Sequence, residues 1–117
     1  MNDSDNDSLQ KSIPHIIIEI VEYMPNAVVT KTIIKKTTGN VTASSFDAGE
    51  ELAEKSLSFD TYIQIIDGTA ELVINGEEHK LVIGNGIIIP AHAKHYFKAR
   101  QQFKMISTVI KSGYEQV

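Results

Sequence analysis

The chain contains no cysteine among its 117 residues, which excludes disulfide bonds, thiolate metal sites and cysteine nucleophiles. It also lacks an excess of positive charge, because 11 Lys and Arg residues stand against 15 Asp and Glu residues, for a formal net charge of −4. Binding to nucleic acid or to an anionic membrane surface depends on a basic protein surface. We therefore expect neither a nucleic acid nor a membrane as a partner.

Long apolar runs are absent as well. The isoleucine run at residues 16–18 ends at Glu19 and is too short to span a bilayer. The first residues, MNDSDNDSLQKS, are acidic and polar, unlike a signal peptide. We therefore expect a cytoplasmic protein. Asp, Asn and Ser cluster in residues 1–12, which predicts a disordered tail, and residues 13–117 are long enough for one domain with one core.

The segment HIIIEIVEY, residues 15–23, has two interpretations. Its β-branched residues favour a strand, because their χ1 angles are restricted. A short helix is the alternative, since Ile17, Ile20 and Val21 would share one helical face. The strand is the preferred prediction.

The rest of the chain is typical of an all-β protein. Segments rich in β-branched residues alternate with turn residues, and no segment predicts an amphipathic helix of useful length. Hairpin turns are expected at Gly39–Asn40, Asp67–Gly68 and Asn75–Gly76, because Asn-Gly and Asp-Gly tolerate the positive φ angles of tight turns. The predicted strands cover residues 27–36, 41–46, 59–66, 69–74, 77–83, 86–90, 95–99 and 103–111.

These elements carry a resemblance to a known family. Gly84, Pro90 and His95 match the second conserved motif of the small cupins, and Gly49 and Gly68 match both ends of the first motif. The chain resembles these single-domain bacterial proteins over roughly residues 27–111. The resemblance implies a double-stranded β-helix, or jelly-roll barrel.

The same comparison implies that the metal site of such a barrel is incomplete. Lys55, Leu57 and Thr61 stand where the first motif has its two histidines and its acidic residue. A divalent metal needs three or four nitrogen or oxygen donors, and only His95 remains, with His92 as the weaker candidate. We expect no cofactor, although a divalent metal stays open as an alternative.

Alternation along the strands predicts which side chains face the barrel interior. If Thr61 faces inward, then Ile63 and Ile65 do so too, and on the facing strand His95, Phe97 and Ala99 point inward together. The ligand-binding residues are therefore expected to be His95, Lys55, Thr61 and Phe97.

Two of these residues have alternative interpretations. His95 could act as a general acid or base, or could be a barrel histidine satisfied by a single hydrogen bond. Lys55 could bind a carboxylate or phosphate without a metal, or its long side chain could extend to water.

We expect a protein that binds an unknown small molecule inside the barrel without a tightly bound metal. One alternative is a metal-dependent or metal-free enzyme of the dioxygenase or isomerase type that uses His95. Another is a structural or regulatory dimer with a filled core. A homodimer is expected, because the outward-facing Tyr62, Gln64 and Ile66 together with residues 15–23 supply more apolar surface than a small monomer needs. The family resemblance also implies two-fold dimers, with residues 15–23 as the best candidate interface element.

Overall fold

The computed structural model describes residues 8–111, and residues 1–7 and 112–117 lie outside the described part of the chain. The predicted all-β fold is confirmed. The regular elements of residues 8–111 are η1 (Ile17–Glu19), β1 (Val28–Lys36), β2 (Gly39–Phe46), β3 (Thr61–Ile74), β4 (Glu77–Val82), β5 (Gly86–Ile89), β6 (His95–Lys98) and β7 (Phe103–Ile110). No helix in this part of the chain is long and apolar enough to cross a membrane.

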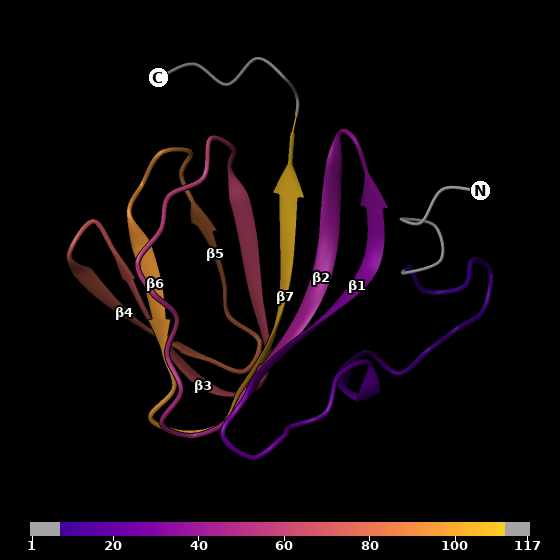
Figure 1. Ribbon diagram of the computed structural model, residues 1–117, viewed down its shortest axis with the longest axis horizontal. Coiled ribbons are helices and arrows are strands. Elements are labelled where there is room, and N and C mark those ends of the chain that lie inside the picture. Colours follow the sequence, from indigo (N-terminus) through magenta and orange to yellow (C-terminus); the bar gives the residue numbers. More distant parts are fainter. Residues whose placement is uncertain (1–7, 112–117) are drawn as a thin grey trace.

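The strands form two antiparallel sheets that share β3. The first sheet has the order β1-β2-β7-β3-β5, and the second sheet has the order β4-β3-β6. Figure 1 shows β4 and β6 on one side of the molecule and β1 and β2 on the other, with β5 and β7 between them. This arrangement is a jelly-roll barrel, as expected from the motifs.

The predicted hairpin at Asp67–Gly68 is wrong, because β3 runs through it as one strand of 14 residues. A bulge between Ile65 and Asp67 and a φ of 71° at Gly68 bend the strand instead of reversing it. Residues before the bend pair with β5 and β7, and residues after it pair with β4 and β6. Gly68 is required there for a second reason, since a Cβ would overlap the carbonyl oxygen of Gln102.

The other two predicted hairpins have different outcomes. Asn75 and Gly76, with φ angles of 50° and 82°, form the two-residue turn between β3 and β4, as predicted. Gly39–Asn40 does not form a turn, because both residues pair with the end of β1 and the turn lies at residues 37–38. Gly39 instead allows the backbone of β7 to lie close to it, since a Cβ there would overlap the carbonyl oxygen of Val109.

The main core fills the space between the two sheets. Three phenylalanines form its centre, with the rings of Phe46 and Phe103 stacked at 4.4 Å and Phe97 tilted at 5.9 Å from Phe46. The predicted alternation is confirmed, because the inward-facing residues of β3 and β6 are buried: Thr61, Ile63, Ile65, His95 and Phe97. A second apolar cluster lies on the outer face of the first sheet, where Ile20 and Val21 pack against Ala43 and Ile106.

The preferred strand for residues 15–23 is wrong. The segment contains one 3-10 turn, η1, and pairs with no strand. Ile20 and Val21 of this segment are buried by packing on the outer face of the first sheet, and the segment does not add a strand to that sheet. The hydroxyl of Ser45 donates to the carbonyl oxygen of Glu22 at 2.8 Å, so a side chain satisfies a group that a ladder would otherwise pair.

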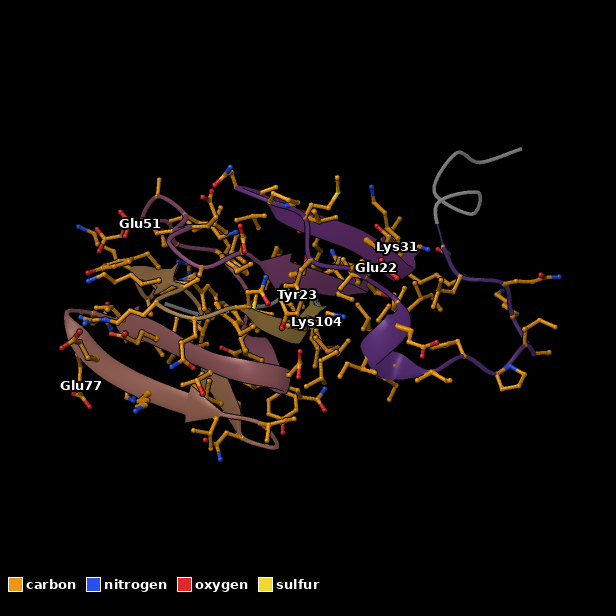
Figure 2. The ribbon with its side chains drawn as sticks, turned by 90° about the horizontal axis from the view of Figure 1, so that it is seen from below. Glu22, Tyr23, Lys31, Glu51, Glu77 and Lys104 are labelled. Carbon is orange, nitrogen blue, oxygen red and sulfur yellow. The ribbon has the colours of Figure 1, made fainter. Side chains whose placement is uncertain are left out.

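Lys104 fixes this N-terminal segment to the barrel. Its side chain is buried, and its ammonium group donates to the carbonyl oxygen of Ile18 at 2.7 Å. The same nitrogen lies 4.9 Å from the centre of the Tyr23 ring, and Figure 2 shows these two labelled side chains next to each other. The Tyr23 hydroxyl donates to Asp67 at 2.7 Å, and burial, with that bond, raises the pKa of Tyr23 well above its usual range.

The predicted disordered tail falls partly outside the described residues, which begin at Ser8. Within the described part, the backbone N–H of Leu9 donates to the carbonyl oxygen of Ile33 at 2.9 Å. The Leu9 side chain packs against the outer cluster, so this part of the tail has an apolar anchor that the composition did not indicate.

Candidate functional site

A cavity of about 150 Å³ lies between the sheets. Its apolar lining consists of Leu52, Leu57, Ile63, Ile89, Phe97 and Met105. Its polar lining consists of Thr30, Thr42, Ser44, Lys55, Thr61, His95 and Ser107. The structure therefore brings together all four predicted ligand-binding residues, and the cavity contradicts the alternative of a filled core.

His95 begins β6 and is 3% exposed. Its Nδ1 atom lies 3.0 Å from the carbonyl oxygen of Ala93. Because a carbonyl oxygen only accepts, Nδ1 carries the hydrogen, and the neutral ring then has its lone pair on Nε2. Within residues 8–111 no hydrogen bond is made to Nε2, so the ring offers an acceptor to a ligand.

Lys55 is held against His95 by its backbone. The Lys55 N–H donates to the His95 carbonyl oxygen at 3.0 Å, and the His95 N–H donates to the Lys55 carbonyl oxygen at 2.8 Å. Residues that exchange both hydrogen bonds lie directly opposite each other, so their side chains are on the same face. Since His95 faces the interior, the Lys55 side chain begins on that side too, and the residue lines the cavity.

Thr61 is the first residue of β3 and is 4% exposed. Its hydroxyl oxygen is buried and has no hydrogen-bond partner among residues 8–111. Burying an unpaired hydroxyl costs free energy, so this group is a feature that packing alone does not explain. It lies in the wall of the same cavity as Lys55 and His95.

Several cavity residues were not identified from the sequence. Thr30, Thr42, Ser44 and Ser107 come from β1, β2 and β7, which form the far wall. The hydroxyls of Thr30 and Ser44 lie 2.9 Å apart and pair with each other. Thr30 could have been identified, because alternation along β1 places it on the same face as Val28. The lining residues on β2 and β7 could not, because their positions depend on pairing between strands far apart in the sequence.

His92 lies outside the cavity and is exposed. It adopts a φ of 72° in the turn before β6, and its backbone N–H donates to the carbonyl oxygen of Leu57 at 2.6 Å. This left-handed conformation is one that glycine adopts more readily than histidine. The structure does not bring His92 together with His95 as a pair of ligands.

The residues at the barrel site do not fit a resident metal ion. The positions that would supply ligands hold Lys55, Leu57, Thr61 and His95, and all four line the cavity. No group of three His, Cys, Asp or Glu side chains suited to a metal occurs within residues 8–111. One imidazole, in a lining that also contains a lysine, does not provide the three or four donors that a divalent metal requires.

Asp47, which directly follows β2, has a shifted carboxyl pKa. Asp47 accepts hydrogen bonds from the backbone N–H of Asn26 at 2.7 Å and from the side chain of Gln102 at 3.0 Å. These bonds, the Asn26 bond first, hold the pKa of the Asp47 carboxyl below its usual range. Asp47 does not line the cavity, so we assign it a structural role.

Comparison of the sequence with family models and with curated proteins gives no match. Comparison of the structure gives clear matches. A conserved protein of unknown function from Streptococcus pyogenes has a TM-score of 0.84 at 24% identity, over 89% of this chain and 91% of that one. A cupin superfamily protein from Desulfitobacterium hafniense has a TM-score of 0.81 at 23% identity, over 89% and 94%. A cupin 2 conserved barrel domain protein from Leptotrichia buccalis has a TM-score of 0.78 at 26% identity, over 80% of this chain and 46% of that one.

Proposed function

Because this chain has the cupin fold, we propose that it is a binding protein for a small molecule, held between the two sheets without a resident metal. The observation that carries the proposal is the cavity itself, in which Lys55, Thr61 and His95 meet within apolar walls. Concave, mostly apolar pockets with a few polar groups are typical of ligand sites.

The polar groups support binding over a purely structural role. Thr61 has an unpaired hydroxyl, and His95 has a free ring acceptor, whereas a core selected for stability alone would leave neither. Lys55 is an exposed residue of the cavity lining, so its charge need not be fully desolvated.

A fragment screen read by methyl NMR tests the proposal. We expect small fragments to shift the methyl resonances of Ile63, Ile89 and Met105, which line the cavity, and to leave the exposed Ile83 unchanged as a control reporter. Shifts that are confined to surface methyls, or no shifts across the screen, would overturn the proposal.

Metal analysis tests the metal-independent part. We expect purified protein to carry no stoichiometric metal and to gain no thermal stability from added iron, manganese, zinc or nickel. Stoichiometric metal that is lost in a His95→Ala variant would contradict this part and would favour the metal-dependent enzyme.

We also propose that the protein acts as a homodimer through its N-terminal segment. Residues 10–19 are all exposed, and Ile13, Ile16 and Ile17 are each more than half exposed. A second apolar area lies on the outer face of the first sheet, where Tyr62 and Ile88 are paired neighbours with exposed side chains. A second copy of the chain would cover such surfaces in a self-complementary way.

Sedimentation equilibrium measures this association. We expect a dimer that dissociates in a variant carrying both Ile16→Ser and Ile17→Ser, and that persists in Ile83→Ser, which removes an equally exposed isoleucine elsewhere. A monomeric wild-type protein at tens of micromolar would refute the dimer.

A further inference from the structure

Resting on the proposed function, we propose that the ligand is a small hydroxy acid. Such a ligand has one carboxylate and one hydroxyl on a short apolar chain. The inference comes from the charge, the hydrogen-bonding groups and the volume of the cavity, which together restrict what can fill it.

The charge of the cavity indicates a monoanion. Among residues 8–111 the lining contains no carboxylate, and Lys55 is its only residue with a fixed charge. Within residues 8–111 Lys55 takes part in no ion pair. Its neighbour Glu54 lines a separate open groove with Glu51 and Lys98, so it does not neutralise the ammonium group from inside. A single carboxylate matches this single positive charge.

The His95 ring indicates a hydrogen-bond donor on the same ligand. In the tautomer whose Nδ1–H donates to Ala93, Nε2 is an acceptor, and no hydrogen bond reaches it from residues 8–111. A simple carboxylate has no donor to offer it, and an unpaired acceptor within the site would cost affinity. A hydroxyl group satisfies Nε2 and leaves the carboxylate for Lys55. The Thr61 hydroxyl, which has no hydrogen-bond partner in the described part of the chain, is able to serve either group.

The walls and the volume limit the rest of the molecule. Leu57, Ile63, Ile89 and Phe97 surround the polar groups, so the remaining atoms of the ligand are expected to be apolar. A cavity of about 150 Å³ is the size that accommodates benzene, which corresponds to roughly six to nine non-hydrogen atoms. The many polar groups of a sugar phosphate or a nucleotide do not match these apolar walls.

A matched set of four probes tests the ligand class by NMR titration at constant ionic strength. The probes are 2-hydroxybutyrate, butyrate, 1,2-butanediol and inorganic phosphate. We expect 2-hydroxybutyrate to bind about tenfold more tightly than butyrate, which lacks the hydroxyl, or butanediol, which lacks the carboxylate. Phosphate is expected to leave the cavity methyl resonances unchanged.

Two variants assign the two groups. Lys55→Met should weaken 2-hydroxybutyrate binding about tenfold and leave butanediol binding unchanged, because only the acid uses the ammonium group. Lys94→Met is the control, since Lys94 is exposed, lies next to His95 in the chain and does not line the cavity. His95→Leu should remove the preference for 2-hydroxybutyrate over butyrate, and circular dichroism should verify its fold.

The outcomes separate this inference from the proposed function. The hydroxy-acid class is overturned if butyrate or butanediol binds as tightly as 2-hydroxybutyrate, if Lys55→Met and Lys94→Met behave alike, or if phosphate binds best. It is also overturned if fragments occupy the cavity and none of the four probes does, and in that case the proposed function stands. If neither fragments nor probes shift the cavity methyls, both fail.

Discussion

Replacing Thr61 with valine should stabilise the protein. Threonine and valine have nearly the same shape, so the change removes a hydroxyl and leaves the packing in place. That hydroxyl is buried and has no partner among residues 8–111, so it is desolvated on folding without gaining a hydrogen bond. A buried unpaired hydroxyl costs about 1–3 kcal/mol, and recovery of the lower part of this range, about 1 kcal/mol, is expected for Thr61→Val.

Thermal and urea unfolding measure the effect. For a domain of this size, 1 kcal/mol corresponds to a rise in Tm of about 4 °C. Thr30→Val is the control, because the hydroxyl of this exposed threonine pairs with Ser44 at 2.9 Å and the residue lines the same cavity. Its loss leaves the buried Ser44 hydroxyl without that partner, so Thr30→Val should lower stability by about 1 kcal/mol. A fall in Tm for Thr61→Val would show that the hydroxyl is satisfied in solution and would refute the reasoning.

Three further predictions concern the framework. Gly68→Ala should lower the free energy of unfolding by about 2 kcal/mol or more, because a Cβ has no room there. Gly76→Ala, which has a positive φ but open space for a Cβ, should cost about 1 kcal/mol. Equal losses in urea unfolding would argue against the close backbone approach at Gly68. The stability that Asp47 gains from its lowered pKa is present above the unfolded-state pKa and is lost as the pH falls. Wild-type protein should therefore exceed Asp47→Asn in urea unfolding at pH 7, and this advantage should shrink as the pH falls below about 4. A difference that stays constant with pH would contradict this. Lys104→Met should speed hydrogen exchange in residues 8–23 and leave β7 protected, because the Ile18 carbonyl loses its donor. Unchanged exchange would show that Lys104 does not hold this segment to the barrel.

The sequence predicted much of the site because strands alternate their side chains strictly. Once Thr61 was placed inward, the orientations of Ile63 and Ile65 followed, and the same rule placed His95 and Phe97. Asn75–Gly76 was predictable for a similar reason, since both φ angles of that turn are set locally.

The two wrong hairpin predictions concern glycines that lie against a distant part of the chain. Gly39 and Gly68 both lack room for a Cβ because backbone atoms of residues 109 and 102 approach them. A local pattern cannot distinguish such a glycine from a turn residue, so both were interpreted as hairpins. The strand prediction for residues 15–23 was wrong for a related reason. Its β-branched residues favour a strand, but Ile20 and Val21 are buried by packing on a sheet face, a non-local contact that the local pattern does not reveal.

The orientation of Lys55 was left open by the sequence, and its backbone pairing with His95 resolves which face the side chain starts from. The alternative interpretation, in which the long side chain extends to water, is compatible with the exposure of Lys55. The pairing adds that the Lys55 side chain begins opposite His95, which is the one histidine in the cavity lining among residues 8–111.

The most direct test of the central claim is a crystal structure of the protein grown with 2-hydroxybutyrate and with zinc in the same drop. We predict density for the organic acid between Lys55 and His95, inside the cavity, with no metal ion there. A zinc ion bound to His95 in place of the acid would contradict a metal-independent binding protein.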